Sequence, residues 1–174
     1  MKIFGITGWS GSGKTTLMVK LLEDLIKRGF KVSTIKHTHH SVDVDRPGKD
    51  SFEHRHAGAH EVMLTGAKRW ALMRELRGSQ EPDMQTLLDR MEFVDIVLVE
   101  GFKRYLHPKL EIFRPKIGKP MIAAKDKTIV AIATDEQALP QINLPVLDID
   151  NVPMITEFVI SHLGFNKRGS SDTT

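Results

Sequence analysis

Residues 8–16 read Gly-Trp-Ser-Gly-Ser-Gly-Lys-Thr-Thr, a stretch whose residue types and spacing match the phosphate-binding pattern G-x-x-x-x-G-K-[ST]. Glycines allow such a loop to adopt positive φ angles and to approach a ligand closely. The N–H groups of the loop and the N-terminus of the following helix then converge on a phosphate group. We expect the Lys14 ammonium to reach the β- and γ-phosphates and the Thr15 hydroxyl to ligate Mg²⁺.

A carboxylate that could complete this site is Glu100, which closes the apolar strand expected over residues 95–100. An acid at the end of a central strand beside a phosphate loop can hold Mg²⁺ directly or through water, or can position an attacking water. We therefore predict that Thr15 and Glu100 bind the metal and that Lys14 and Glu100 serve any hydrolysis. Alternatively, Glu100 is a solvated residue of the turn that follows the strand.

Asp135 follows the apolar strand expected over residues 128–133 and is the candidate for the base contact. An aspartate can accept hydrogen bonds from N1–H and from the 2-amino group of guanine, whereas adenine offers no such pair of donors. The usual Asn-Lys-x-Asp form is absent, since the chain has Ala133-Thr134-Asp135. A lone Asp after a strand is also typical of a turn, so both interpretations stay open.

Six of the eight histidines lie between residues 37 and 60. Their spacing matches no standard zinc signature, and the chain contains no cysteine. We interpret this segment as a polar loop that hydrogen-bonds anions. Asp43 and Asp45, in the same segment, either assist Mg²⁺ or solvate the loop.

The elements that must position these residues alternate between strands and helices. An apolar run at residues 3–7 precedes the phosphate loop, and apolar residues spaced for one helix face follow it from Leu17 to Ile26. Further strands are expected over 31–36, 61–65, 69–73, 95–100, 128–133 and 145–149, and further helices over 50–60, after Asp83 and after Asn151.

This alternation predicts an α/β fold of the P-loop NTPase class, with three α/β/α layers, a mainly parallel sheet and a β excursion around 102–117. The carboxyl ends of parallel strands meet at one edge, where ligands bind. We therefore expect the phosphate loop, Glu100 and Asp135 to gather at that edge. Residues 1–165 are predicted to form a single domain and residues 166–174 a flexible C-terminal tail.

Composition narrows the functional classes. The chain has 174 residues with a net charge of +3, but its 25 Lys and Arg are scattered among 22 acids and aromatic residues are few. We therefore expect no nucleic-acid binding. No apolar stretch is long enough to span a bilayer, which argues against a membrane protein. The N-terminus enters the first expected strand at once, without a targeting segment, and a cytoplasmic location is expected.

Several segments together resemble the MobB family, the molybdopterin-guanine dinucleotide biosynthesis proteins B. The resemblance extends from the first strand to about residue 165, and the block after residue 36 is more specific than the phosphate loop. The segments that carry it are 8–16 (GWSGSGKTT), 35–40 (IKHTHH), 43–51 (DVDRPGKDS), 69–73 (RWALM) and 97–103 (VLVEGFK).

The resemblance implies a GTP-binding accessory protein whose catalysis is at most slow hydrolysis of GTP. It implies a homodimer that assists the guanylyltransferase MobA in converting molybdopterin to molybdopterin guanine dinucleotide. The implied ligands are GTP, Mg²⁺ and, as a further candidate, molybdopterin. His39 and His40 are expected to donate hydrogen bonds to a phosphorylated pterin. The implied nucleotide contacts are Gly11, Ser12, Gly13, Lys14, Thr15, Thr16 and Asp135.

Two other functions use the same phosphate loop. A small-molecule kinase would need a lid of arginines over the transferred phosphoryl group, and no compact arginine cluster is visible in the sequence. A metal-delivery GTPase would use the histidine-rich segment. Phosphoryl transfer to small acceptors would support the first alternative, and metal binding without nucleotide would support the second.

Overall fold

The computed structural model describes residues 1–38, 42–102, 105–136, 139 and 142–165. The chain divides into two compact units, Met1–His37 with Glu92–Thr174, and Thr38–Met91. The single domain over 1–165 stays a prediction, and the predicted tail over 166–174 lies outside the described residues.

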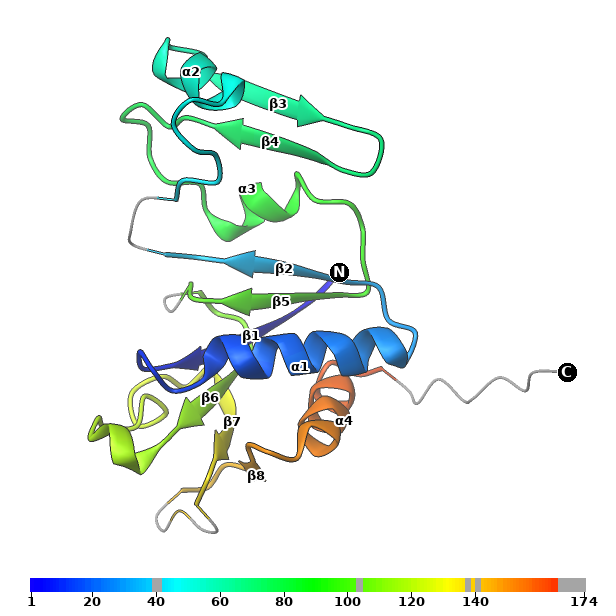
Figure 1. Cartoon of the computed structure of the whole chain (residues 1–174). Coiled ribbons are helices and arrows are strands. Elements are labelled where there is room, and N and C mark those ends of the chain that lie inside the picture. Colours follow the sequence, from blue (N-terminus) through cyan, green and yellow to red (C-terminus); the bar gives the residue numbers. More distant parts are fainter. Residues whose placement is uncertain (39–41, 103–104, 137–138, 140–141, 166–174) are drawn as a thin grey trace, which may run out of the picture. The chain divides into compact units, whose positions relative to one another are not determined.

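The first unit is built on a six-stranded sheet with the order β2-β5-β1-β6-β7-β8 (Figure 1). Its neighbouring strands pair in parallel throughout, which confirms the predicted α/β fold with a parallel sheet. The strands are β1 (Lys2–Gly8), β2 (Val32–Lys36), β5 (Ile96–Glu100), β6 (Lys109–Phe113), β7 (Ile129–Thr134) and β8 (Val146–Asp148). Their carboxyl ends therefore share one edge of the sheet.

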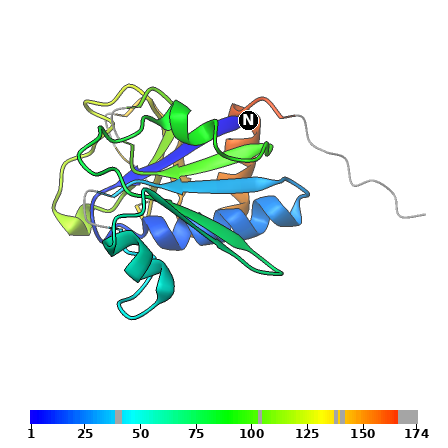
Figure 2. The same cartoon turned by 90° about the horizontal axis from the view of Figure 1, so that it is seen from above.

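The helices α1 (Lys14–Lys27) and α4 (Val152–His162) pack together on one face of this sheet. Figure 2 shows α1 running along that face. Leu21 and Leu25 of α1 and Ile155 of α4 are fully buried there, because the apolar stripe of each helix faces the strands. The side chain of Asn151 caps α4 by accepting a hydrogen bond from Met154 N at 3.1 Å.

The segment predicted as a β excursion does contain a strand, but β6 lies inside the main sheet, between β1 and β7. The alternation of polar and apolar residues was misleading, since Lys109 and Glu111 are buried as completely as their apolar neighbours. The Glu111 carboxylate accepts hydrogen bonds from Ile122 N (2.8 Å) and Ala123 N (2.7 Å). These partners come from the loop between β6 and β7, so polar side chains are satisfied on a covered face.

This loop covers the face of β6 opposite to α1 and α4. Within the described residues of the first unit, α1 and α4 are the only α-helices. After β6, the short 3-10 helix η1 (Pro115–Ile117) leads into the loop.

The second unit consists of α2 (Asp50–His56), β3 (Glu61–Thr65), β4 (Trp70–Arg74) and α3 (Met84–Leu88). β3 and β4 correspond to the strands expected over 61–65 and 69–73, and they form an antiparallel pair. Asp83 caps α3 through its side chain, which accepts a hydrogen bond from Thr86 N at 2.8 Å. The first helix ends at His56 rather than at residue 60, because Gly58 takes a φ of 113°. No described helix of either unit is long and apolar enough to cross a membrane.

Candidate functional site

The phosphate loop has the backbone that the sequence predicts. Gly8, Gly11 and Gly13 adopt φ angles of 148°, 77° and 98°, in the region that favours glycine. A side chain at Gly8 is excluded for a second reason, since a Cβ there would lie 2.7 Å from both the Ile112 carbonyl and the Ser12 hydroxyl. Gly13 precedes the first residue of α1, so the loop delivers the chain directly into the N-terminus of that helix. This geometry can receive an anion.

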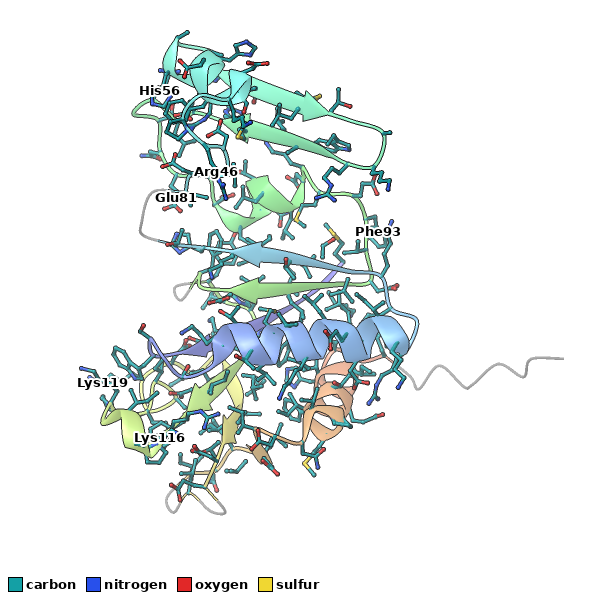
Figure 3. All side chains as sticks on the ribbon, in the orientation of Figure 1. Arg46, His56, Glu81, Phe93, Lys116 and Lys119 are labelled. Atoms are coloured by element: carbon teal, nitrogen blue, oxygen red, sulfur yellow. The ribbon has the colours of Figure 1, made fainter. Side chains whose placement is uncertain are left out.

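Lys14 is tethered to the loop itself. Its Nζ donates a hydrogen bond to the Trp9 carbonyl at 2.9 Å. The Trp9 indole in turn donates to the Pro120 carbonyl at 2.7 Å, which joins the phosphate loop to the loop after η1. Lys119 Nζ lies 5.9 Å from the centre of the Trp9 ring, at cation–π distance. Figure 3 shows Lys116 and Lys119 at the sheet edge where the phosphate loop lies.

Glu100 stands at the end of β5 beside the strand that feeds the phosphate loop. It is in register with Ile6 of β1 and with Lys36 of β2. The Glu100 side chain is 13% exposed, and its Oε2 lies 3.8 Å from Lys36 Nζ. Gly101 follows with a φ of 96°, and a Cβ there would be 2.8 Å from the His37 carbonyl. The turn therefore requires glycine and fixes where the carboxylate leaves the strand.

Asp135 lies just beyond β7 and is held by an arginine that the sequence did not single out. Arg114, the residue after β6, donates from Nη1 to Asp135 Oδ2 at 2.5 Å. Arg114 also donates from Nε to the Ser12 carbonyl at 3.1 Å. Lys116 Nζ lies 3.5 Å from the same Asp135 oxygen. The available signal was the position of Arg114 at the carboxyl end of a parallel strand.

The surroundings of Asp135 favour its ionised form. Partial burial acts to raise the pKa of its carboxyl group, but hydrogen bonds from its own backbone and from Arg114 outweigh this effect. The pKa therefore lies below its usual value. An ionised carboxylate is the form that accepts hydrogen bonds from two donors of a base.

A pocket of about 90 Å³ opens next to this pair. It is lined by the start of α1, by Arg114 and by the residues after β8: Gly13, Thr16, Leu17, Lys20, Arg114, Ile149 and Asp150. Pockets that enclose a whole small ligand measure roughly 300–1,000 Å³. This pocket would therefore enclose only a part of a nucleotide whose phosphates lie on the adjoining loop.

Asp43 and Asp45, the candidates for Mg²⁺ assistance or solvation of the loop, both form ion pairs with one arginine. Arg55 of α2 donates from Nε to Asp45 Oδ2 at 3.0 Å and from Nη2 to Asp45 Oδ1 at 2.6 Å. It also binds Asp43 at 3.3 Å and Glu75 at 2.5 Å. Both aspartates are thus acceptors for an arginine of the same unit. Their carboxylates stabilise the conformation of the segment by ion pairing.

The predicted pterin donors His39 and His40 lie outside the described residues. Of the other histidines in the segment, His56 places Nδ1 3.0 Å from the Phe52 carbonyl and stacks on the Phe52 ring. Arg46 is labelled with His56 in Figure 3. Among the residues that the structure describes, no group of three or more His, Asp or Glu side chains is arranged to hold a metal ion.

Comparison with known proteins agrees with these features. Residues 3–135 match the family model described as "Molybdopterin guanine dinucleotide synthesis protein B". The chain is 41% identical over 161 residues to the molybdopterin-guanine dinucleotide biosynthesis adapter protein of Escherichia coli, covering 91% of each chain. It is 41% identical to the adapter protein of Haemophilus influenzae, covering 90% of this chain and 86% of that protein.

The fold is also similar to that of a solved structure. The crystal structure of Bacillus subtilis MobB aligns with a TM-score of 0.76 at 25% identity, over 95% of this chain and all of that one. The chain has a phosphate loop on a parallel sheet, and the family model matches more than half of its residues. This chain therefore belongs to the MobB family of P-loop nucleotide-binding proteins.

Proposed function

We propose that the chain binds GTP with Mg²⁺ at the phosphate loop of the first unit and acts as an adapter in the synthesis of molybdopterin guanine dinucleotide. The observation that carries the proposal is the arrangement at the sheet edge. A phosphate loop of correct backbone geometry is connected through Arg114 to the ionised Asp135. The identity of 41% with adapter proteins over most of the chain supports the pathway.

Guanine selection is assigned to Asp135. Arg114 and Lys116 both contact Oδ2 of its carboxylate. A carboxylate has two oxygens with about four lone-pair sites, so one group can bind an arginine and still accept from a base. Adenine presents no matching pair of donors, and the contact would therefore favour GTP over ATP.

Mg²⁺ is assigned to Thr15 and Glu100, with phosphate oxygens of the nucleotide as further ligands. Thr15 is the second residue of α1, and Glu100 ends the strand next to β1. Hard oxygen ligands of this kind suit Mg²⁺. Any hydrolysis would be slow and would use Lys14 and Glu100, and the adapter role would consist of presenting nucleotide to a partner guanylyltransferase of the MobA type.

We also propose a homodimer, and the β3–β4 hairpin supports it. Met63 and Trp70 are each 62% exposed, and Leu72 is 40% exposed. Met63 pairs with Leu72 and Thr65 with Trp70, so the period of two places these apolar side chains on one face of the hairpin. A second copy of the chain would cover this face. Molybdopterin binding by the segment that contains His39 and His40 remains part of the proposal.

Calorimetric titration with GTP and with ATP, each with Mg²⁺, tests the nucleotide assignment. GTP should bind at least tenfold more tightly, and Glu100→Gln should slow Mg²⁺-dependent hydrolysis while leaving GDP affinity without Mg²⁺ within twofold. Equal affinity for the two nucleotides would refute guanine selection. Loss of GDP affinity without Mg²⁺ would assign Glu100 a structural role instead.

An activation assay tests the adapter role. Purified guanylyltransferase, molybdopterin cofactor and GTP are combined with a molybdoenzyme that requires the guanine dinucleotide. Adding this protein should raise the yield of active enzyme, and the pair His39→Ala and His40→Ala should reduce the gain while GTP binding persists. No gain at any concentration, or phosphorylation of a small acceptor by the protein alone, would favour the kinase alternative.

A further inference from the structure

We propose that Arg114 is a positioning residue that joins the two halves of the nucleotide site, so that phosphate binding and base selection depend on each other. Arg114 holds a peptide group of the phosphate loop with one nitrogen and the carboxylate of Asp135 with another. The inference rests on the proposed nucleotide site and adds to it a residue that acts through its neighbours.

The first half of the link is the Ser12–Gly13 peptide. Ser12 is 1% exposed, and none of the described residues hydrogen-bonds to its hydroxyl group. The Ser12 carbonyl does have a partner, the Nε of Arg114. A donor on the carbonyl of a peptide group polarises that group and strengthens the N–H on its other side. Arg114 therefore fixes and polarises the peptide whose N–H, that of Gly13, belongs to the phosphate-binding loop.

The second half of the link is the Asp135 carboxylate. Two cations contact its Oδ2, but they are not equivalent. Arg114 is 2.5 Å away with a side chain that is 22% exposed, whereas Lys116 is 3.5 Å away and 70% exposed. Because solvent screens an exposed ion pair, the contact with Arg114 dominates the orientation of the carboxylate.

The link transmits position because the guanidinium group is rigid. Its Nε and Nη1 belong to one plane and cannot move independently. A shift of the Ser12–Gly13 peptide on phosphate binding therefore moves the nitrogen that holds Asp135. Arg114 also lines the pocket together with Gly13 and Thr16, so a nucleotide would meet this residue between its phosphates and its base. Coupling of this kind is reciprocal between the two parts of the site.

The first experiment compares Arg114→Ala with Lys116→Ala as the matched control. The affinities for GTP, ATP and inorganic tripolyphosphate, each with Mg²⁺, are measured by calorimetry after thermal melting has shown that each variant is folded. Arg114→Ala should weaken tripolyphosphate binding and reduce the ratio of GTP to ATP affinity about tenfold. Lys116→Ala should leave that ratio within twofold. An unchanged ratio in folded Arg114→Ala would overturn the proposal.

Arg114→Lys separates position from charge. A lysine keeps the positive charge but has a single donor group, which cannot hold the Ser12 carbonyl and Asp135 in one rigid plane. The GTP to ATP ratio of this variant should therefore stay close to that of Arg114→Ala. Full recovery of the ratio by lysine would show that charge alone suffices and would contradict the proposal.

A double-mutant cycle tests the link with a ligand that has no base. Asp135→Asn should change tripolyphosphate affinity threefold or more in the wild-type background, but not in the Arg114→Ala background. A through-space charge effect would persist in both backgrounds, and that result would overturn the link. Because tripolyphosphate has no base, these measurements test the link even if the wild-type protein shows no preference for GTP. That lack of preference would refute base selection by Asp135, but not the link.

Discussion

Arg55 and Arg114 both bind carboxylates, but their surroundings differ. Arg55 binds Asp45, Glu75 and Asp43, and its side chain is 11% exposed. Hydrogen bonds from Arg55 hold the pKa of Asp45 and of Glu75 below their usual values. The cation thus binds three acids of its own unit, which lie 10 to 20 residues from it along the chain.

Arg114 binds one carboxylate and one backbone carbonyl, and it lines a pocket beside the phosphate loop. The comparison is between an ion pair that we assign to stability and one that we assign to the proposed nucleotide site. An arginine that pairs with several acids of its own unit fixes a conformation, whereas an arginine that borders a pocket and a phosphate loop can act on a ligand.

The largest effect is expected at Lys14, the other cation of the proposed nucleotide site. Lys14→Ala should lower GTP affinity by about a hundredfold or more, because hydrogen bonds to charged groups contribute roughly 1.5–3 kcal/mol each and this lysine is assigned to two phosphates. Calorimetry on the folded variant measures the change. Lys27→Ala, at the far end of α1, is the matched control and should bind normally. Normal GTP binding by Lys14→Ala would contradict the proposal that this loop binds the phosphates.

A tenfold effect is expected at Asp135. Asp135→Asn replaces one carboxylate oxygen by a donor, so it should reduce the preference for GTP over ATP about tenfold with a smaller effect on ATP itself. The neighbouring exposed Glu136 provides the control, since Glu136→Gln leaves the contact with Arg114 in place. If selectivity survives in Asp135→Asn, another residue reads the base.

A smaller effect, and one on stability rather than binding, is expected at Arg55. Arg55→Gln leaves Asp45 and Glu75 without their cation, so limited proteolysis within residues 38–91 should become several-fold faster. GTP affinity should remain within twofold of the wild-type value. Arg90→Gln removes a cation of the same unit that has only a 3.8 Å ion pair with Glu61, and its digestion should be unchanged. A large loss of GTP affinity in Arg55→Gln would contradict a purely structural role for this arginine.

An effect that develops only at low pH is expected at His107, next to the buried Lys109 of the strand that precedes Arg114. Burial, with a contribution from the charge of Lys109, lowers the pKa of His107 to about 4. The unfolded state, with a histidine pKa near 6.5, therefore binds a proton between pH 6.5 and 4 that the folded state does not. Stability from this group is complete above about pH 6.5 and declines by up to roughly 1.4 kcal/mol per pH unit as the pH falls toward 4.

Urea unfolding of the wild-type protein and of His107→Gln between pH 7 and 4.5 measures this contribution. The variant should show a shallower fall in unfolding free energy with decreasing pH, whatever its stability at pH 7. The exposed His162, replaced by Gln, serves as the control and should reproduce the wild-type slope. Identical slopes for His107→Gln and the wild-type protein would show that His107 is protonated alike in the folded and unfolded states.

Local features of the sequence predicted much of the fold correctly. The phosphate loop follows from three glycines and their neighbours, because the required φ angles are properties of single residues. The caps of α3 and α4 follow equally well, since Asp83 and Asn151 bond to amides only three residues away. The β3–β4 hairpin is also a short-range pairing, within two residues of its predicted bounds.

The place of β6 and the partners of the charged residues could not be read from the sequence. In the sequence, Lys109 and Glu111 alternate with apolar residues, as in a strand that has one exposed face. Their burial is possible because a loop covers them. Arg114 reaches Ser12 and Asp135, which are 102 and 21 residues away, because the parallel sheet brings the carboxyl ends of distant strands to one edge. Backbone conformation is set locally and was therefore determined by the sequence pattern, whereas ion pairs across a sheet depend on strand order, which only the tertiary structure decided.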